Sequence, residues 1–158
     1  MKATLFILLT SLLFVHCSGS SSPSPDGDKP AVIRTGTSFG MCLGIACRKD
    51  YTFNGTSVTL TQQAGGRPQP QSSPIMCDKT ISAADWDALQ SLANFDSFAK
   101  QPSRLGCPDC ADGGAEYIEL QRGDSVYRIT FEFGRTIPGF EPLVEALRKQ
   151  REAFDSCK

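Results

Sequence analysis

The sequence predicts an α+β fold in which two β-hairpins form an antiparallel sheet and two helices pack on one face of it. Two pairs of alternating apolar segments each flank a short glycine-containing turn, and an amphipathic helical pattern follows each pair. We therefore expect the order hairpin, helix, hairpin, helix, because amphipathic helices bury their apolar stripes on a shared sheet face.

The first hairpin is expected to join a strand over residues 47–53 to a strand over residues 56–62. Asn54-Gly55 stands between them, and this dipeptide is typical of a two-residue type I′ turn. Upstream, Ala31-Val32-Ile33 opens an apolar segment. Residues 36–44 are rich in glycine and predict a strand broken by a tight turn.

A loop and then a helix are expected to follow the first hairpin. Residues 63–76 contain glycines, prolines and glutamines and predict a loop. Ser82 can cap a helix over residues 83–94, with Asp85 in the capping-box position. The two phenylalanines of residues 95–98 predict a short turn packed on the core.

The second hairpin is the strongest strand signal in the chain. Residues 116–121 and 126–133 alternate around Arg122-Gly123-Asp124-Ser125. Pro142 suits the first turn of a final helix. An apolar stripe at helical spacing supports this helix and comprises Phe140, Leu143, Val144, Leu147 and Phe154.

Residues 1–16 have the pattern of an export signal. A short positive start precedes an apolar run that is too short for a stable membrane span. The run ends at His16-Cys17, and a Ser/Pro-rich stretch follows. This segment resembles a bacterial lipoprotein signal, which implies that Cys17 is lipidated and becomes the first residue. The alternative is an ordinary signal cut near Gly19.

The expected domain organisation follows from this signal. Residues 1–16 are the signal peptide, residues 17–30 carry the lipidated cysteine and a flexible tether, and residues 31–158 form a single globular domain. The membrane is then a partner through the lipid on Cys17, and we expect localisation in the cell envelope. Ser18 resembles the residue that follows the cysteine in outer-membrane lipoproteins, if the host is Gram-negative.

Histidine content and charge limit the chemistry that we expect. The chain has one histidine, His16, which leaves with the signal, so a histidine general base and imidazole zinc ligands are not expected. Lys plus Arg is 16 and Asp plus Glu is 17, which predicts no nucleic-acid partner. We therefore expect neither an enzyme nor a cofactor.

The remaining cysteines form an even set in an exported domain, which predicts up to three disulfides without choosing their pairing. These disulfide candidates are Cys42, Cys47, Cys77, Cys107, Cys110 and Cys157. Cys107-Pro108-Asp109-Cys110 also has the spacing of a redox motif, but loop-forming residues flank it. Cys42, Cys47, Cys107 and Cys110 could alternatively hold zinc.

Three carboxylates around two glycines offer an alternative calcium site at Asp109, Asp112 and Glu116, without the order of an EF-hand. The favoured interpretation is a turn followed by a solvated Glu116, with no metal. Asn54-Gly55-Thr56 fits the glycosylation pattern but is needed as a turn. The last helix has a charged face that we expect to be solvated, formed by Arg148, Lys149, Arg151 and Glu152.

Two motifs carry a resemblance to a known family. Residues 38–47 read SFGMCLGIAC, and residues 106–116 read GCPDCADGGAE. Together they resemble a family of small uncharacterised bacterial lipoproteins, found mainly in Bacteroidota-like genomes, over most of residues 36–147. The resemblance implies export, a lipid anchor and a compact cysteine-containing domain, and it implies no activity.

The predicted function is that of an exported, lipid-anchored envelope protein with a disulfide-stabilised, non-catalytic binding or structural domain. One alternative is a thiol-disulfide oxidoreductase that uses Cys107 and Cys110. Another is an extracellular inhibitor or ligand-binding module that presents the loop of residues 36–44 or of residues 107–114.

Overall fold

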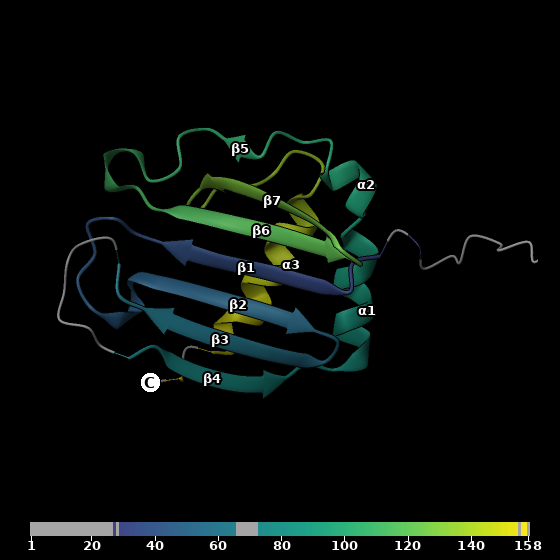
Figure 1. The fold of residues 1–158 in the computed structure, drawn as a ribbon, viewed down its shortest axis with the longest axis horizontal. Helices are drawn as coiled ribbons and strands as arrows, with labels where there is room; N and C mark the ends of the chain where they lie inside the picture. The colour runs from purple at the N-terminus through teal and green to yellow at the C-terminus, as the bar shows by residue number, and fades with distance from the viewer. Residues whose placement is uncertain (1–26, 28, 66–72, 155, 158) are drawn as a thin grey trace, which may run out of the picture.

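The computed structural model describes residues 27, 29–65, 73–154 and 156–157. Its main feature is one seven-stranded sheet with the order β4-β3-β2-β1-β6-β7-β5 (Figure 1). Neighbouring strands are antiparallel except β5, which is parallel to β7. The strands are β1 (Val32–Ser38), β2 (Arg48–Asn54), β3 (Ser57–Gln63), β4 (Ile75–Thr80), β5 (Arg104–Leu105), β6 (Ala115–Arg122) and β7 (Ser125–Glu132).

The predicted fold of two hairpins covered by two helices on one face is wrong. Both hairpins exist, as β2–β3 and β6–β7, but β1 lies between them and pairs with β2 and β6. The edge strands β4 and β5 add to the sheet, and the described residues contain three α-helices. The protein therefore has a strand-rich mixed sheet. The predicted loop over residues 63–76 overlaps the end of β3 and the start of β4, and residues 66–72 lie outside the described part.

The first hairpin turns one residue later than predicted. Asn54 pairs with Ser57, so Gly55 and Thr56 form the turn, and Gly55 supplies the positive φ of 58°. This register places Phe53 opposite Val58, and both side chains are fully buried. Burial of this pair fixes the register, because a shift of one residue would turn an apolar side chain to the solvent.

The helices are α1 (Ala83–Leu92), α2 (Phe95–Phe98) and α3 (Glu141–Glu152). Ser82 caps α1 as predicted, because its hydroxyl accepts a hydrogen bond from the Asp85 amide at 3.0 Å. Pro142 lies in the first turn of α3, and the five apolar residues of the predicted stripe are buried. In Figure 1, α3 crosses behind the sheet, while α1 and α2 lie at the end where β6 finishes.

The core lies between the sheet and the helices. Alternating residues of the central strands face it, including Ile33, Phe53, Leu60, Ile118 and Ile129, and all of these are at most 1% exposed. Phe98 and Phe140 pack edge to face from the helical side, with ring centroids 5.2 Å apart. The opposite face of the sheet, toward the viewer in Figure 1, carries no helix of the described residues.

The two ends of the sheet differ in what they carry. At one end β1 and β7 finish and β2 and β6 begin, so the segments 39–47 and 106–114 lie there together (Figure 1). We call this the cysteine-loop end. At the opposite end the chain enters β1 at Val32, and both hairpins turn there.

The predicted export features fall almost entirely outside the described residues. These are the signal over residues 1–16, the lipidation site Cys17 and most of the tether over residues 17–30. Within the described ranges, no helix has the length and apolar character needed to cross a membrane.

Candidate functional site

Among the described residues, three disulfides hold the domain. They are Cys42–Cys47, Cys77–Cys157 and Cys107–Cys110. The predicted disulfide-stabilised domain is therefore confirmed, and the structure supplies the pairing that the sequence left open. The four cysteines of the alternative zinc site are engaged in the two short-range disulfides rather than grouped as thiolates.

The first cysteine loop, residues 39–47, is tied at both ends. The Phe39 amide donates to the carbonyl of Cys47 at 3.0 Å, and the Cys42–Cys47 disulfide closes the loop inside this bond. Met41 and Leu43 project from the loop and are 50% and 71% exposed. The closed backbone therefore presents apolar side chains to the solvent.

The second cysteine loop, residues 106–114, has an unusual backbone. Asp109, Ala111 and Asp112 have φ angles of 62°, 50° and 60°, and within the described ranges they are the non-glycine residues with positive φ. Each such residue costs about 1 kcal/mol or more, and such strain is concentrated at functional sites. The Gly114 carbonyl helps to hold the loop by accepting hydrogen bonds from the amides of Asp109 and Phe133.

The two loops contact each other although their motifs lie far apart in the sequence. Asp109 Oδ1 accepts a hydrogen bond from the Gly40 amide at 3.2 Å. The ring of Phe39 packs on Phe133, with centroids 4.9 Å apart, and covers Gly114 so closely that a Cβ there would overlap the ring. The structure thus brings both predicted cysteine loops into one surface.

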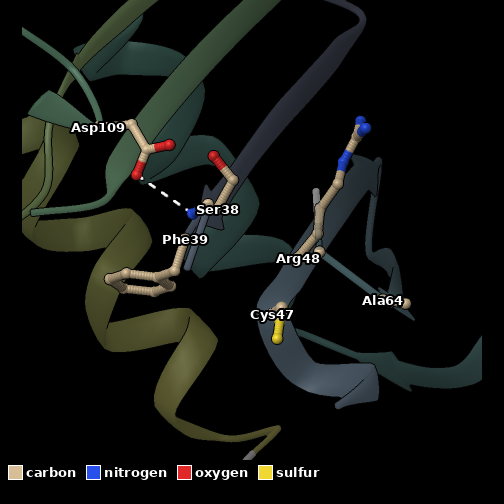
Figure 2. Close-up of a pocket in the computed structure, with 8 residues that line it drawn as sticks. Ser38, Phe39, Cys47, Arg48, Ala64 and Asp109 are labelled. Carbon is tan, nitrogen blue, oxygen red and sulfur yellow. Dashed lines mark hydrogen bonds between the residues drawn. The ribbon is translucent and has the colours of Figure 1, made fainter. Parts of the chain in front are cut away.

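A pocket of about 390 Å³ opens beside this contact (Figure 2). Ser38, Phe39 and Asp109 form one wall, and Cys47, Arg48 and Ala64 form the other. Gly40 and Gly65 complete the lining. Asp109 binds the Gly40 amide on its wall, and the Arg48 guanidinium is paired with Asp50 and points away from the opposite wall (Figure 2).

The prediction that Glu116 is a solvated residue at the edge of a strand is wrong. Its side chain is 1% exposed and faces α3, where Arg148 and Arg151 bind its two carboxylate oxygens. The Gly134 amide donates a further hydrogen bond to the carboxylate, at 3.2 Å. Burial raises the pKa of Glu116, but the hydrogen bonds and charges of the two arginines outweigh burial and hold the pKa below its ordinary value.

The prediction that the charged face of α3 is solvated is therefore wrong for two of its four residues, Arg148 and Arg151. Arg148 also donates to the carbonyl of Arg135 at 2.6 Å, and Arg151 donates to the Thr35 hydroxyl at 3.1 Å. Lys149 and Glu152 are exposed as predicted. The arginine pair joins α3 to the sheet near the cysteine-loop end.

The structure does not assemble the alternative calcium site. Asp109 turns to Gly40, Asp112 is exposed, and the Glu116 carboxylate is occupied by arginines on the helical side. Across the described residues, no group of three or more His, Cys, Asp or Glu side chains is placed to hold a metal ion.

The Cys107–Cys110 pair differs from a thioredoxin-like site in its surroundings. Only a short 3-10 turn (Cys110–Asp112) follows, so no long helix directs its N-terminus at the cysteines. The Glu132 carboxylate accepts a hydrogen bond from the Cys107 amide at 2.8 Å, which places negative charge next to the pair. Both cysteines are nevertheless exposed and line a hollow of about 290 Å³.

The sequence of the chain matches no protein-family model, and a search of curated proteins finds no match to it.

Proposed function

We propose that this protein is an exported, lipid-anchored cell-envelope protein whose disulfide-stabilised domain binds a partner protein through the cysteine-loop end. The observation that carries the proposal is the joining of two disulfide-closed loops into one surface that leaves Met41, Leu43 and Phe133 exposed. Exposed apolar side chains grouped on one surface are typical of interaction sites. A rigid frame also loses little conformational entropy on binding.

The path of the chain supports this proposal. The tether of residues 17–30 leads to Val32, at the end of the sheet opposite the cysteine loops. A lipid on Cys17 would therefore hold that end toward the membrane, and the cysteine loops would face away from it. What they present is apolar surface on a fixed backbone, which favours a non-catalytic binding role.

Site-specific photo-crosslinking in the host bacterium tests the binding surface. A photoreactive residue is placed at Leu43 or at Phe133, which are 71% and 48% exposed. The matched control position is Val126, which is 51% exposed and lies at the opposite end of the sheet. We expect one discrete protein adduct shared by positions 43 and 133 and absent at position 126. Equal adducts at all three positions, or none at 43 and 133, would contradict the proposal.

Metabolic labelling with palmitate tests the anchor separately. We expect the wild-type protein to incorporate the label and Cys17→Ser to lose it, because the cysteine thiol is the acylated group of a lipoprotein. Label that survives in Cys17→Ser would refute lipidation at this residue. The crosslinking result stands independently of this outcome.

A second candidate function is thiol-disulfide exchange at Cys107 and Cys110, favoured by their exposure beside a hollow. Insulin reduction by dithiothreitol tests it, with the double variant Cys107→Ser, Cys110→Ser compared with Cys42→Ser, Cys47→Ser. Acceleration by wild type that only the first variant loses would establish exchange. We expect no acceleration, because only a short 3-10 turn follows the pair and no long helix directs its N-terminus at the cysteines.

A further inference from the structure

The sheet face that carries no helix has a compact charged cluster on its central strands. Arg48 Nε lies 2.8 Å from the Asp50 carboxylate. Arg34 and Arg128 each lie 2.8 Å from a different oxygen of Glu119. Three guanidinium groups thus share two carboxylates, which leaves one positive charge in excess within the cluster.

A hollow of about 210 Å³ lies beside this cluster. Its lining residues come from β1, β2, β6 and β7 and are Thr37, Ser38, Arg48, Tyr117, Arg128 and Thr130. The strand register explains the grouping, because Ser38 is the direct partner of Arg48 and Tyr117 is the direct partner of Thr130. Four strands therefore place side chains around one small space.

The position of Arg128 over this hollow is fixed by Tyr117. The Tyr117 ring lies against Gly36, where a Cβ would overlap it, and its hydroxyl donates to Asp50 Oδ1 at 2.7 Å. The Arg128 guanidinium stacks 4.0 Å from the centroid of this ring, while its Nε binds Glu119. Arg128 is thus held from two sides, and little ordering is needed before it binds a ligand.

Several hydrogen-bond donors around the hollow are left for a ligand. Arg48 uses Nε and Nη2 on Asp50, and Arg128 uses Nε on Glu119. Other donors around the hollow have no hydrogen-bond partner within the described part of the chain. They are Arg48 Nη1, the two Nη atoms of Arg128 and the hydroxyls of Ser38 and Thr130. Arginine pairs readily with oxyanions, and a hydrogen bond from a charged donor is stronger than one between neutral groups.

We propose that this hollow binds the phosphate group of a small solute, either inorganic phosphate or a phosphate monoester. The donors come from β1, β2 and β7 and approach from different sides. A tetrahedral phosphate presents oxygens in several directions and can meet all of them. A carboxylate has only two oxygens, both in one plane, and would meet fewer of these donors at once. The excess positive charge of the cluster favours an anion.

Isothermal titration calorimetry at constant ionic strength tests the proposal on the full-length protein in detergent. Inorganic phosphate, glycerol 3-phosphate and acetate are the probes. We expect Arg48→Gln and Arg128→Gln to weaken phosphate binding about tenfold or more, as the loss of a charge-assisted hydrogen bond predicts. Arg34→Gln is the matched control for charge, since it removes the same charge and a bond to the same Glu119 without lining the hollow, and it should weaken binding less than the other two variants.

The outcomes are distinct. Binding of glycerol 3-phosphate as tight as that of phosphate supports the proposal with an ester as ligand, and binding of phosphate alone supports it with the free ion. Ser38→Ala touches no ion pair, and a severalfold loss in this variant supports the site if Arg128→Gln fails to fold. Acetate binding as tight as phosphate, equal loss in Arg34→Gln, or no heat with phosphate would overturn the proposal.

Discussion

Glu116 is buried between the sheet and α3, and its negative charge is retained there because two arginines and a backbone amide surround it. A buried carboxylate without partners would take up a proton, whereas a paired one stays ionised. Because Arg148 and Arg151 belong to α3 and Glu116 belongs to β6, this cluster fixes the helix to the sheet near the cysteine-loop end.

Glu116→Gln should lower the free energy of unfolding by about 2 to 4 kcal/mol at neutral pH, because it leaves two partly buried arginines without their carboxylate. Urea unfolding followed by circular dichroism measures the change. Lys149→Gln, at an exposed position of the same helix, is the control and should change stability by less than about 0.5 kcal/mol.

The stability of the wild-type protein and that of Glu116→Gln should depend differently on pH in the acidic range. The folded-state pKa of Glu116 lies below the unfolded-state value of about 4.3, so its stabilisation is complete above that value and is lost as the pH falls through the lower folded-state pKa. The stability difference between wild type and Glu116→Gln should therefore shrink as the pH falls below about 5. A constant or growing difference would show that the carboxylate is not the cause.

Gly36→Ala should destabilise the domain by about 1 to 3 kcal/mol, because a Cβ at this position overlaps the Lys49 carbonyl oxygen and the Tyr117 ring. The measurement is the midpoint of thermal unfolding. Gly113→Ala is the matched control, since Gly113 has an ordinary φ of −70° and its nearest neighbour, the Cys110 carbonyl oxygen, lies 3.2 Å from the added Cβ. Similar losses in both variants would contradict the packing argument.

Individual side chains were only partly predictable from the sequence. Glu116 shares the alternation of Ile118 and Leu120 within the predicted strand over residues 116–121, and this alternation already indicated the buried face. Its partners gave no local signal, because Arg148 and Arg151 lie on the flank of a helix whose position against β6 is a long-range contact. The same distance in sequence hid the hydrogen bond between Asp109 and Gly40.

The elements with strong local patterns were predicted well. Strands β2, β3, β6 and β7 and helix α1 lie within one to two residues of their expected bounds, and α3 forms over the predicted apolar stripe with Pro142 in its first turn. In contrast, β4 was missed because its inward side chains are Ile75, Cys77 and Lys79, of which only one is strongly apolar. The two residues of β5 are too few for any periodicity to show.

A disulfide that closes a longer loop of the unfolded chain should contribute more to stability, with a logarithmic dependence on loop length. Cys77–Cys157 spans a sequence separation of 80 and joins β4 to the C-terminal segment after α3. Its removal by the double variant Cys77→Ser, Cys157→Ser should cost about 3 to 4 kcal/mol, because it closes a long loop of the unfolded chain.

The comparison is with Cys107→Ser, Cys110→Ser, which opens a separation of 3 and should cost about 1 to 2 kcal/mol. Chemical denaturation of both variants measures these values. A larger loss from the short-range pair would show that the 106–114 loop supports the fold more than loop closure alone predicts.

The arrangement of the whole molecule depends on contacts that the local sequence does not encode. Strand β1 pairs with β2 and also with β6, whose partner residues lie more than 75 positions away. This placement of β1 between the hairpins brings its C-terminal loop beside the loop that precedes β6. The sequence identified both cysteine loops as candidates, but their union into one surface follows only from the strand order.

The most direct test of the proposed binding surface is the affinity of the purified domain for the protein captured by crosslinking at Leu43 and Phe133. Calorimetry compares wild type with Leu43→Ser and with Val126→Ser, which removes an exposed apolar side chain at the opposite end of the sheet. We expect Leu43→Ser to weaken binding about tenfold or more and Val126→Ser to leave it unchanged. Unchanged affinity in Leu43→Ser, or equal loss in both variants, would contradict binding through the cysteine-loop end.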